Sequence, residues 1–181
     1  MHAWKHFKTI TKHKTMVMKY CFKVGLYKQG LLHDLSKYSW VEFSAGAKYY
    51  QGTRSPNNAE REATGLSKAW LHHKGRNRHH YEYWIDYSLR DKDNLEGVQM
   101  PRNYVAEMLI DRMCASKVYN GKKYKDSSSL EYYEGGTKKL WFIHEQTKKE
   151  LEMLITMLAQ KGEEETLSYI KNVFLKGEDK R

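Results

Sequence analysis

Apolar side chains recur every three or four residues along most of this chain, and no stretch shows a sustained alternation of apolar and polar residues. A period of three to four places side chains on one face of an α-helix, whereas a half-buried strand needs alternation. The clearest example lies within residues 3–24, at Trp4, Phe7, Ile10, Val17, Tyr20, Cys21 and Val24. The sequence therefore predicts an all-α fold.

Glycine, proline and helix-capping residues divide the chain into about seven or eight helices. Ser39 and Glu42 form a capping-box pattern, and we assign Glu42 only the role of the capping acid. Pro101 suits the first turn of a helix, Thr137 is expected to cap another, and Gly162 to end it. The expected helices span 3–24, 31–37, 39–50, 57–74, 78–87, 101–119, 137–160 and 163–175, with long loops at 88–99 and 120–136.

The composition is that of a folded globular domain. Hydrophobic residues make up 40% of the 181 residues and aromatic residues 13%, which excludes a disordered chain. Cys21 and Cys114 form neither a disulfide framework nor a CxxC zinc site, so we expect a cytoplasmic setting, or the host cytoplasm for a phage-encoded chain. No run of 18 apolar residues and no signal peptide is present, so we expect no membrane partner.

The chain is strongly basic, with 32 Lys and Arg residues against 22 Asp and Glu residues and a formal charge of +10. Such a charge attracts anions, and a nucleotide, a nucleic acid or a membrane surface could supply them. The basic residues are scattered along the chain rather than gathered in one arm. A solvated helix surface explains them as well, so the charge alone selects no partner.

Histidines are frequent and unevenly placed. Of the nine in the chain, four fall within nine residues, at His72, His73, His79 and His80. Another precedes an aspartate in the segment LLHDLSK, as His33-Asp34, and His13 lies between two lysines. Imidazole and carboxylate groups together are ligands for Zn, Mn or Fe. A two-metal phosphohydrolase needs several imidazoles, a carboxylate that bridges the ions and a closing carboxylate from another helix.

The segment LLHDLSK resembles the defining motif of the HD superfamily, the helical metal-dependent phosphohydrolases. Its members carry in order a His, a His-Asp pair, further His residues and a closing Asp, and this chain offers His13, His33-Asp34, the two histidine pairs and Asp111. Asp111 lies in EMLIDR, which is similar to the closing helix of the superfamily. We therefore expect one compact HD-like helical domain over 1–175, with a metal-site core at 6–119, a C-terminal helical pair at 137–175 and a tail at 176–181.

The chain is more closely similar to an uncharacterised bacterial and phage family. The matching segments are HKTMV, GLLHDLSKYSWVEF, YYQGTRSP, AWLHHKGRNRHHYEYW and EMLIDRMCASKVY. Members of that family are sometimes labelled catalase, yet nothing in this sequence resembles haem ligation. The family has no established reaction that the resemblance carries over.

The superfamily resemblance implies a cofactor of one or two divalent transition-metal ions, such as Mn, Fe, Co or Zn. His33 would bind one ion, and Asp34 would bind one ion or bridge two. His13 and Asp111 would complete the first ion. Asp34 would also be catalytic, because it would hold both ions beside the attacking water.

One histidine from each pair would serve the second ion. We favour His73 and His80, because they are seven residues apart and an unbroken helix would place them on one face. His72 and His79 have the same spacing, and Gly75 interrupts the segment, so the choice within each pair stays open.

Four basic residues are candidates for substrate binding. Lys37 follows the His-Asp pair by three residues, and in the superfamily a lysine there contacts a substrate phosphate, so we count it as catalytic as well. Arg54, Arg76 and Arg78 are further candidates, because arginine can bind a phosphate through two hydrogen bonds. Glu107, one turn before Asp111, is a less certain candidate as an extra ligand or as a partner of the ligands.

These features predict a metal-dependent phosphohydrolase that acts on a nucleotide or another small phosphate ester through a metal-activated water. One alternative is a di-iron oxygenase of the HD fold, because that minority of the superfamily uses the same ligand order and the same lysine. A second alternative is a basic nucleic-acid-binding protein without catalysis. The oligomeric state and the role of residues 120–136 stay open.

Overall fold

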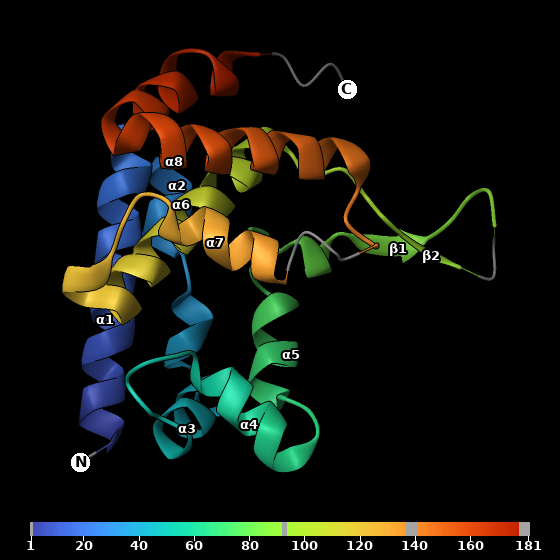
Figure 1. Ribbon diagram of the computed structural model, residues 1–181. Helices are drawn as coiled ribbons and strands as arrows, with labels where there is room; N and C mark the ends of the chain where they lie inside the picture. Colours follow the sequence, from blue (N-terminus) through green and yellow to red (C-terminus); the bar gives the residue numbers. More distant parts are fainter. Residues whose placement is uncertain (1, 92–93, 137–140, 178–181) are drawn as a thin grey trace.

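The computed structural model describes residues 2–91, 94–136 and 141–177 (Figure 1). The helices in these residues are α1 (His2–Lys23), α2 (Tyr27–Leu32), α3 (Trp40–Lys48), α4 (Pro56–Thr64), α5 (Lys68–Lys74), α6 (Arg102–Asn120), α7 (Ser128–Gly135) and α8 (Glu145–Asn172). Single 3-10 turns are η1 (Leu35–Tyr38), η2 (Tyr81–Tyr83), η3 (Gly121–Lys123) and η5 (Phe174–Lys176). The expectation of a helical fold with about eight helices is confirmed.

Helix α6 runs through the middle of the molecule. Its residues from Val105 to Ile110 are all buried, which occurs only in a helix that is covered on every side. It contacts α1 and α8, and the shared core contains Val17, Cys21, Leu109, Met113, Cys114, Leu151, Leu154 and Leu158. Both cysteines are free and fully buried, as expected of small core residues. In Figure 1, α8 lies at one end of the molecule and α3, α4 and α5 lie at the other.

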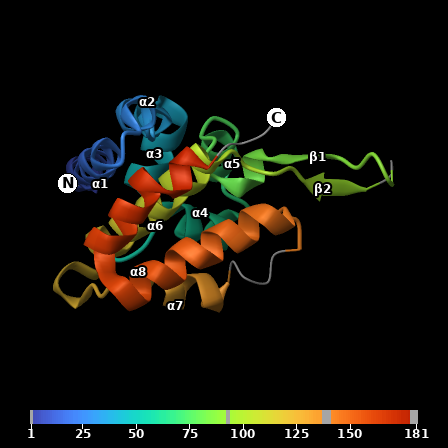
Figure 2. The ribbon, with the colours of Figure 1, turned by 90° about the horizontal axis from the view of Figure 1, so that it is seen from above.

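A short antiparallel hairpin replaces one predicted helix. Residues 78–87 were expected to be helical, but they form η2 and strand β1 (Ile85–Tyr87), which pairs with β2 (Leu95–Gly97). The segment YEYWIDY is rich in aromatic and β-branched residues, which favour extended backbone over helix. Figure 2 shows this hairpin extending away from the helical body.

Four other segments differ from the expectation. The predicted helix 31–37 is the end of α2 and the turn η1, which the left-handed backbone of Asp34 separates. The predicted helix 57–74 is two helices, because Gly65 adopts a φ of 82° and ends α4. The predicted loop 120–136 contains η3 and α7. Helix α8 begins after His144 rather than at Thr137, which lies outside the described residues, as do residues 178–181 of the expected tail. The helix end expected at Gly162 agrees with the structure, because the backbone of Gly162 is not helical (φ 80°, ψ 177°) and divides α8 into two helical segments at a kink.

Among the described residues, no helix is long and apolar enough to span a bilayer. A close contact between two helices holds α1 against α3. Gly46 lies under the buried side chain of His6, and a Cβ atom at this position would overlap the imidazole ring. The imidazole also packs against the rings of Phe43 and Tyr50.

Substituting Gly46→Ala should therefore destabilise the fold by about 1–3 kcal/mol, because the added methyl group overpacks a buried contact. Urea unfolding of the metal-free protein would measure the change. Gly135→Ala is the matched control, since a Cβ there meets nothing within 4 Å, and its effect should be much smaller. Equal stability of the two variants would show that the helices do not pack as described.

Candidate metal centre

Asp34 occupies the junction between α2 and η1. Its backbone is left-handed, with φ 56° and ψ 21°, and among the described residues it is the one non-glycine with a positive φ. This conformation is uncommon for a side chain other than Asn or Asp and is found most often at functional sites. The turn buries the carboxylate, which is 1% exposed, in the interior between α1, α5 and α6.

One oxygen of Asp34 belongs to a first group of ligand atoms. Nε2 of His13 lies 3.5 Å from Oδ2 of Asp34 and 2.9 Å from Oδ1 of Asp111. Nε2 of His33 lies 3.3 Å from the same Asp34 oxygen and 3.5 Å from the same Asp111 oxygen. The two imidazole nitrogens are 3.4 Å apart. All four atoms therefore converge on one point between α1, α2 and α6.

The other oxygen of Asp34 belongs to a second group, which is completed by three histidines. Nε2 of His73 lies 3.2 Å and Nε2 of His79 3.6 Å from Oδ1 of Asp34. Nε2 of His80 lies 2.9 Å from Nε2 of His73. His73 comes from α5, whereas His79 and His80 follow it in the turn that leads to η2. Each group lies within 4.8 Å, and Asp34 is common to both.

Two buried glutamates hold the outer faces of these histidines. Oε1 of Glu107 lies 2.9 Å from Nδ1 of His33 and 3.2 Å from Nδ1 of His79, so one carboxylate orients a histidine of each group. Oε2 of Glu42 lies 2.8 Å from Nδ1 of His73. A carboxylate on the far nitrogen fixes which imidazole nitrogen faces a metal and strengthens it as a ligand.

Our interpretation of Glu42 as the capping acid was wrong. Ser39 makes no side-chain hydrogen bond to the start of α3, so no capping box forms there. Glu42 is instead buried, and its second oxygen lies 2.6 Å from Nδ1 of His72. His72 therefore points outward to Glu42, while His73 points inward to Asp34.

The inward-facing atoms are suited to a metal ion. Both carboxylate oxygens of Asp34 and Nε2 of His79 are buried without a hydrogen bond, although Nζ of Lys37 forms an ion pair 2.5 Å from Oδ2. Buried polar atoms without partners are rare in native proteins, and a bound ion would satisfy these. Imidazole and carboxylate donors suit Mn, Fe, Co or Zn. These groups could hold a metal ion at two adjacent positions.

The carboxylates are ionised before any ion binds. Burial disfavours their charged forms, but His33 and Lys37 outweigh burial and lower the pKa of Asp34 well below its usual range. His13 and His33 do the same for the pKa of Asp111. The same carboxylates raise the pKa of His33 and His73 despite burial, so an incoming cation would meet ionised carboxylates and displace protons from these imidazoles.

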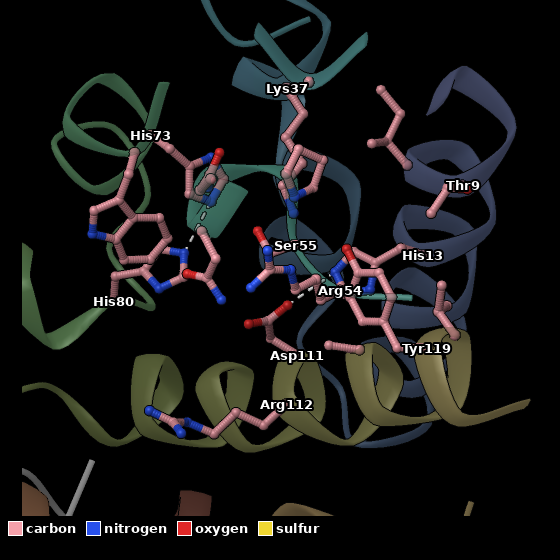
Figure 3. Close-up of a pocket in the computed structure, with 18 of the residues that line it drawn as sticks. Thr9, His13, Lys37, Arg54, Ser55, His73, His80, Asp111, Arg112 and Tyr119 are labelled. Atoms are coloured by element: carbon pink, nitrogen blue, oxygen red, sulfur yellow. Dashed lines mark hydrogen bonds and ion pairs between the residues drawn. The ribbon is translucent and has the colours of Figure 1, made fainter. Parts of the chain in front are cut away.

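A cavity of about 430 Å³ opens beside the two groups. It is lined by His13, His73, His80 and Asp111, and Lys37 and Arg54 reach it from η1 and from the segment before α4 (Figure 3). Arg54 forms two hydrogen bonds to Glu62, at 2.7 and 2.6 Å. Arg61 and Arg112 also line the cavity, and neither was among the expected substrate-binding residues, although Arg112 ends the EMLIDR segment.

The structure brings together all six residues expected to bind metal: His13, His33, Asp34, His73, His80 and Asp111. It adds His79, the alternative within the second histidine pair, and it leaves His72, the alternative within the first pair, outside the groups. Glu107 joins His33 and His79 in a third group. Metal binding by these residues stays a prediction.

Two of the expected substrate-binding arginines do not reach the cavity. Nη1 of Arg76 donates to the backbone oxygen of His72 at 3.2 Å. The guanidinium of Arg78 lies over the ring of Tyr83, 5.6 Å from its centre. The loop between the histidine pairs points these side chains away from the cavity, so we withdraw them as candidates.

Substituting Glu107→Gln should weaken divalent-metal binding by about 10- to 100-fold, because the neutral amide no longer holds the imidazoles of both groups as strongly. Calorimetric titration of the metal-free protein with Mn²⁺ or Zn²⁺ would measure the affinity. Glu145→Gln, on the exposed first turn of α8, is the control and should bind as the natural protein does. Unchanged affinity in the Glu107 variant would contradict its assigned role.

Comparison with known proteins adds a family but no activity. A family model described as "Family of unknown function (DUF5662)" matches residues 2–157, which cover the whole candidate metal centre. A search of curated proteins found no match, and a search of solved structures found none either. The chain belongs to this family of unknown function.

Proposed function

We propose that this protein is a metal-dependent phosphohydrolase of the HD type that acts on a nucleotide or another small phosphate ester. One observation carries the proposal: the two oxygens of Asp34 face two separate sets of ligand atoms beside one cavity. A carboxylate shared between two imidazole-rich groups could hold two ions as close together as two-metal hydrolysis needs. The resemblance of LLHDLSK to the HD motif supports the same reaction class.

Different residues of the chain would have different roles in hydrolysis. Bound divalent ions would lower the pKa of a water molecule and polarise a phosphoryl oxygen. Asp34 would keep the two positions at a fixed separation, and Glu107 and Glu42 would keep the imidazoles oriented. The ammonium group of Lys37 lines the cavity next to Asp34, so it would neutralise charge that develops on the phosphoryl oxygens.

Substituting Asp34→Asn should abolish turnover, since it removes the shared charge while preserving the shape of the side chain. Lys37→Met should lower kcat by about 100-fold through loss of one positioned charge. Hydrolysis of a panel of nucleotides and small phosphate esters by Mn²⁺-loaded protein would measure both effects. His144→Ala, at the start of α8, is the control and should retain full turnover.

Retained turnover in the Asp34→Asn variant would contradict this assignment. Elemental analysis of protein purified without chelator would accompany the assay. Iron in the protein together with oxygen uptake, and no hydrolysis of any ester, would instead favour the oxygenase alternative.

A second candidate function, nucleic-acid binding, rests on the outer face of α1. Lys5, Lys8, Lys12, Lys19 and Lys23 are exposed and lie within about 60° of one another around the helix axis. None of these five forms an ion pair in the part of the chain that the structure describes. The first 59 residues contain two acids, Asp34 and Glu42, and both are buried in the metal centre.

This lysine ridge is flanked by the exposed side chain of Trp4, which stacks on Phe7 at 5.5 Å. Lysines beside exposed aromatic rings are typical of surfaces that bind single-stranded nucleic acid. The triple substitution of Lys8, Lys12 and Lys19 by Gln should lower affinity for a fluorescent 20-nucleotide DNA and reduce the slope of log K against log salt by about 2.

A matched control removes the same charge from scattered positions, by substituting Lys48, Lys68 and Lys171 with Gln. Fluorescence anisotropy across a range of NaCl concentrations would measure both variants. An equal loss of affinity in the two variants, or binding that does not respond to salt, would exclude a nucleic-acid site on α1.

A further inference from the structure

The cavity continues past the metal centre along helix α1. Thr9 and His6 precede His13 by one and two helical turns, and all three line the cavity. At a rise of 1.5 Å per residue, Thr9 and His6 lie about 6 and about 10 Å from His13 along the axis of α1. Figure 3 shows Thr9, His13 and Tyr119 on the same side of the cavity. A molecule with its phosphate at the metal centre would extend along this wall.

His6 is the least satisfied polar group on this wall. It is 6% exposed, and its Nδ1 atom is buried without a hydrogen-bond partner. Burial, assisted by the charge of Lys37, lowers the pKa of His6 to about 4, so the imidazole is neutral near pH 7. It belongs to none of the metal-ligand groups among the described residues. An unpaired buried nitrogen costs free energy, and a ligand group that reached this atom would remove that cost.

The groups beside His6 are neutral hydroxyls on aromatic or short side chains. The hydroxyl groups of Thr9 and Tyr50 lie 2.9 Å apart, and both residues line the cavity. The ring of Tyr50 lies 5.9 Å from that of His6, and Tyr119 adds another phenol from α6. Hydroxyl groups and a neutral imidazole both donate and accept hydrogen bonds. Thr9 donates its proton to the backbone oxygen of Lys5 at 3.0 Å, so Tyr50 donates to Thr9 and both oxygens are left to accept. This part of the cavity therefore suits a ligand group that donates hydrogen bonds.

We propose that the wall formed by His6, Thr9 and Tyr50 binds the uncharged, hydroxyl-bearing part of the substrate, which makes the substrate a phosphorylated sugar or polyol. This inference rests on the proposed phosphohydrolase function, because it needs the phosphate to sit at the metal centre. An ester with an apolar group would leave His6 unpaired and would offer no proton to the oxygens of Thr9 and Tyr50, which already hydrogen-bond to each other. A site that hydrogen-bonds substrate hydroxyls strongly rejects analogues without them.

A pair of ligands that differ only in hydroxyl groups tests the proposal. Butylphosphonate and 3,4-dihydroxybutylphosphonate have the same carbon chain and charge, and their carbon–phosphorus bond resists hydrolysis during the titration. Calorimetry on the Mn²⁺-loaded full-length protein should show at least tenfold tighter binding of the dihydroxy compound. Equal affinities, or no binding of either compound, would overturn the proposal.

Substitutions in the cavity wall then show which residues cause the preference for the dihydroxy compound. Tyr50→Phe removes a single hydroxyl group, and His6→Phe removes the unpaired nitrogen, so each should reduce the preference for the dihydroxy compound to about threefold or less. Tyr49→Phe is the matched control, because Tyr49 is the neighbouring phenol and does not line this cavity. A preference that survives in both cavity variants would show that the hydroxyls bind elsewhere.

The two proposals fail in distinguishable ways. If the dihydroxy preference and its loss in the variants are observed but no phosphate ester is hydrolysed, the wall is correctly assigned and the hydrolase function is wrong. If esters are hydrolysed with equal efficiency whether or not they carry hydroxyl groups, the hydrolase function stands and the wall assignment is wrong. Tighter binding of adenosine monophosphate that is insensitive to Tyr50→Phe would also contradict the wall assignment.

Discussion

The carboxylate of Asp34 is the group around which the rest of the molecule is organised. A buried charge is costly unless partners surround it, and here four histidines and Lys37 lie within 3.6 Å of its two oxygens. Those partners come from α1, the α2–η1 junction, α5 and the turn after α5, so one side chain draws together elements from residues 13 to 80. The left-handed backbone at Asp34 is the local strain that this arrangement requires.

A second layer of charge explains how the imidazoles keep their directions. Glu107, on the central helix α6, serves His33 and His79, and Glu42, on α3, serves His73. Burial of these glutamates is compatible with a stable fold because each has charged or hydrogen-bonding partners. These contacts link the packing of the core to the site, because residues 105–110 of α6 are buried on all sides and Glu107 therefore has little freedom to move. Farther along the cavity, the proposed wall of His6, Thr9 and Tyr50 binds the uncharged part of the ligand.

Most of the candidate ligand set could be predicted from the sequence, because the order His, His-Asp, His pairs and Asp can be recognised without knowledge of the fold. The choice of His73 over His72 agrees with the structure, although the reasoning required an unbroken helix and α5 ends at Lys74. Residues after Lys74 no longer follow the helix of α5. His79 and His80 therefore both lie at the site, and the side chains of Arg76 and Arg78 point away from it. The role of Glu42 could not be predicted, since a capping acid and a buried partner of histidine look alike in sequence.

The hairpin at 85–97 was missed because two three-residue strands carry too short an alternation to detect.

The central claim is that Asp34 separates two metal positions, and anomalous X-ray scattering tests it most directly. Crystals grown with Mn²⁺ would be measured near the manganese absorption edge. The account predicts two peaks, one beside Oδ2 of Asp34 among His13, His33 and Asp111, and one beside Oδ1 among His73, His79 and His80. No peak within these two groups, or a single peak that does not touch Asp34, would contradict it.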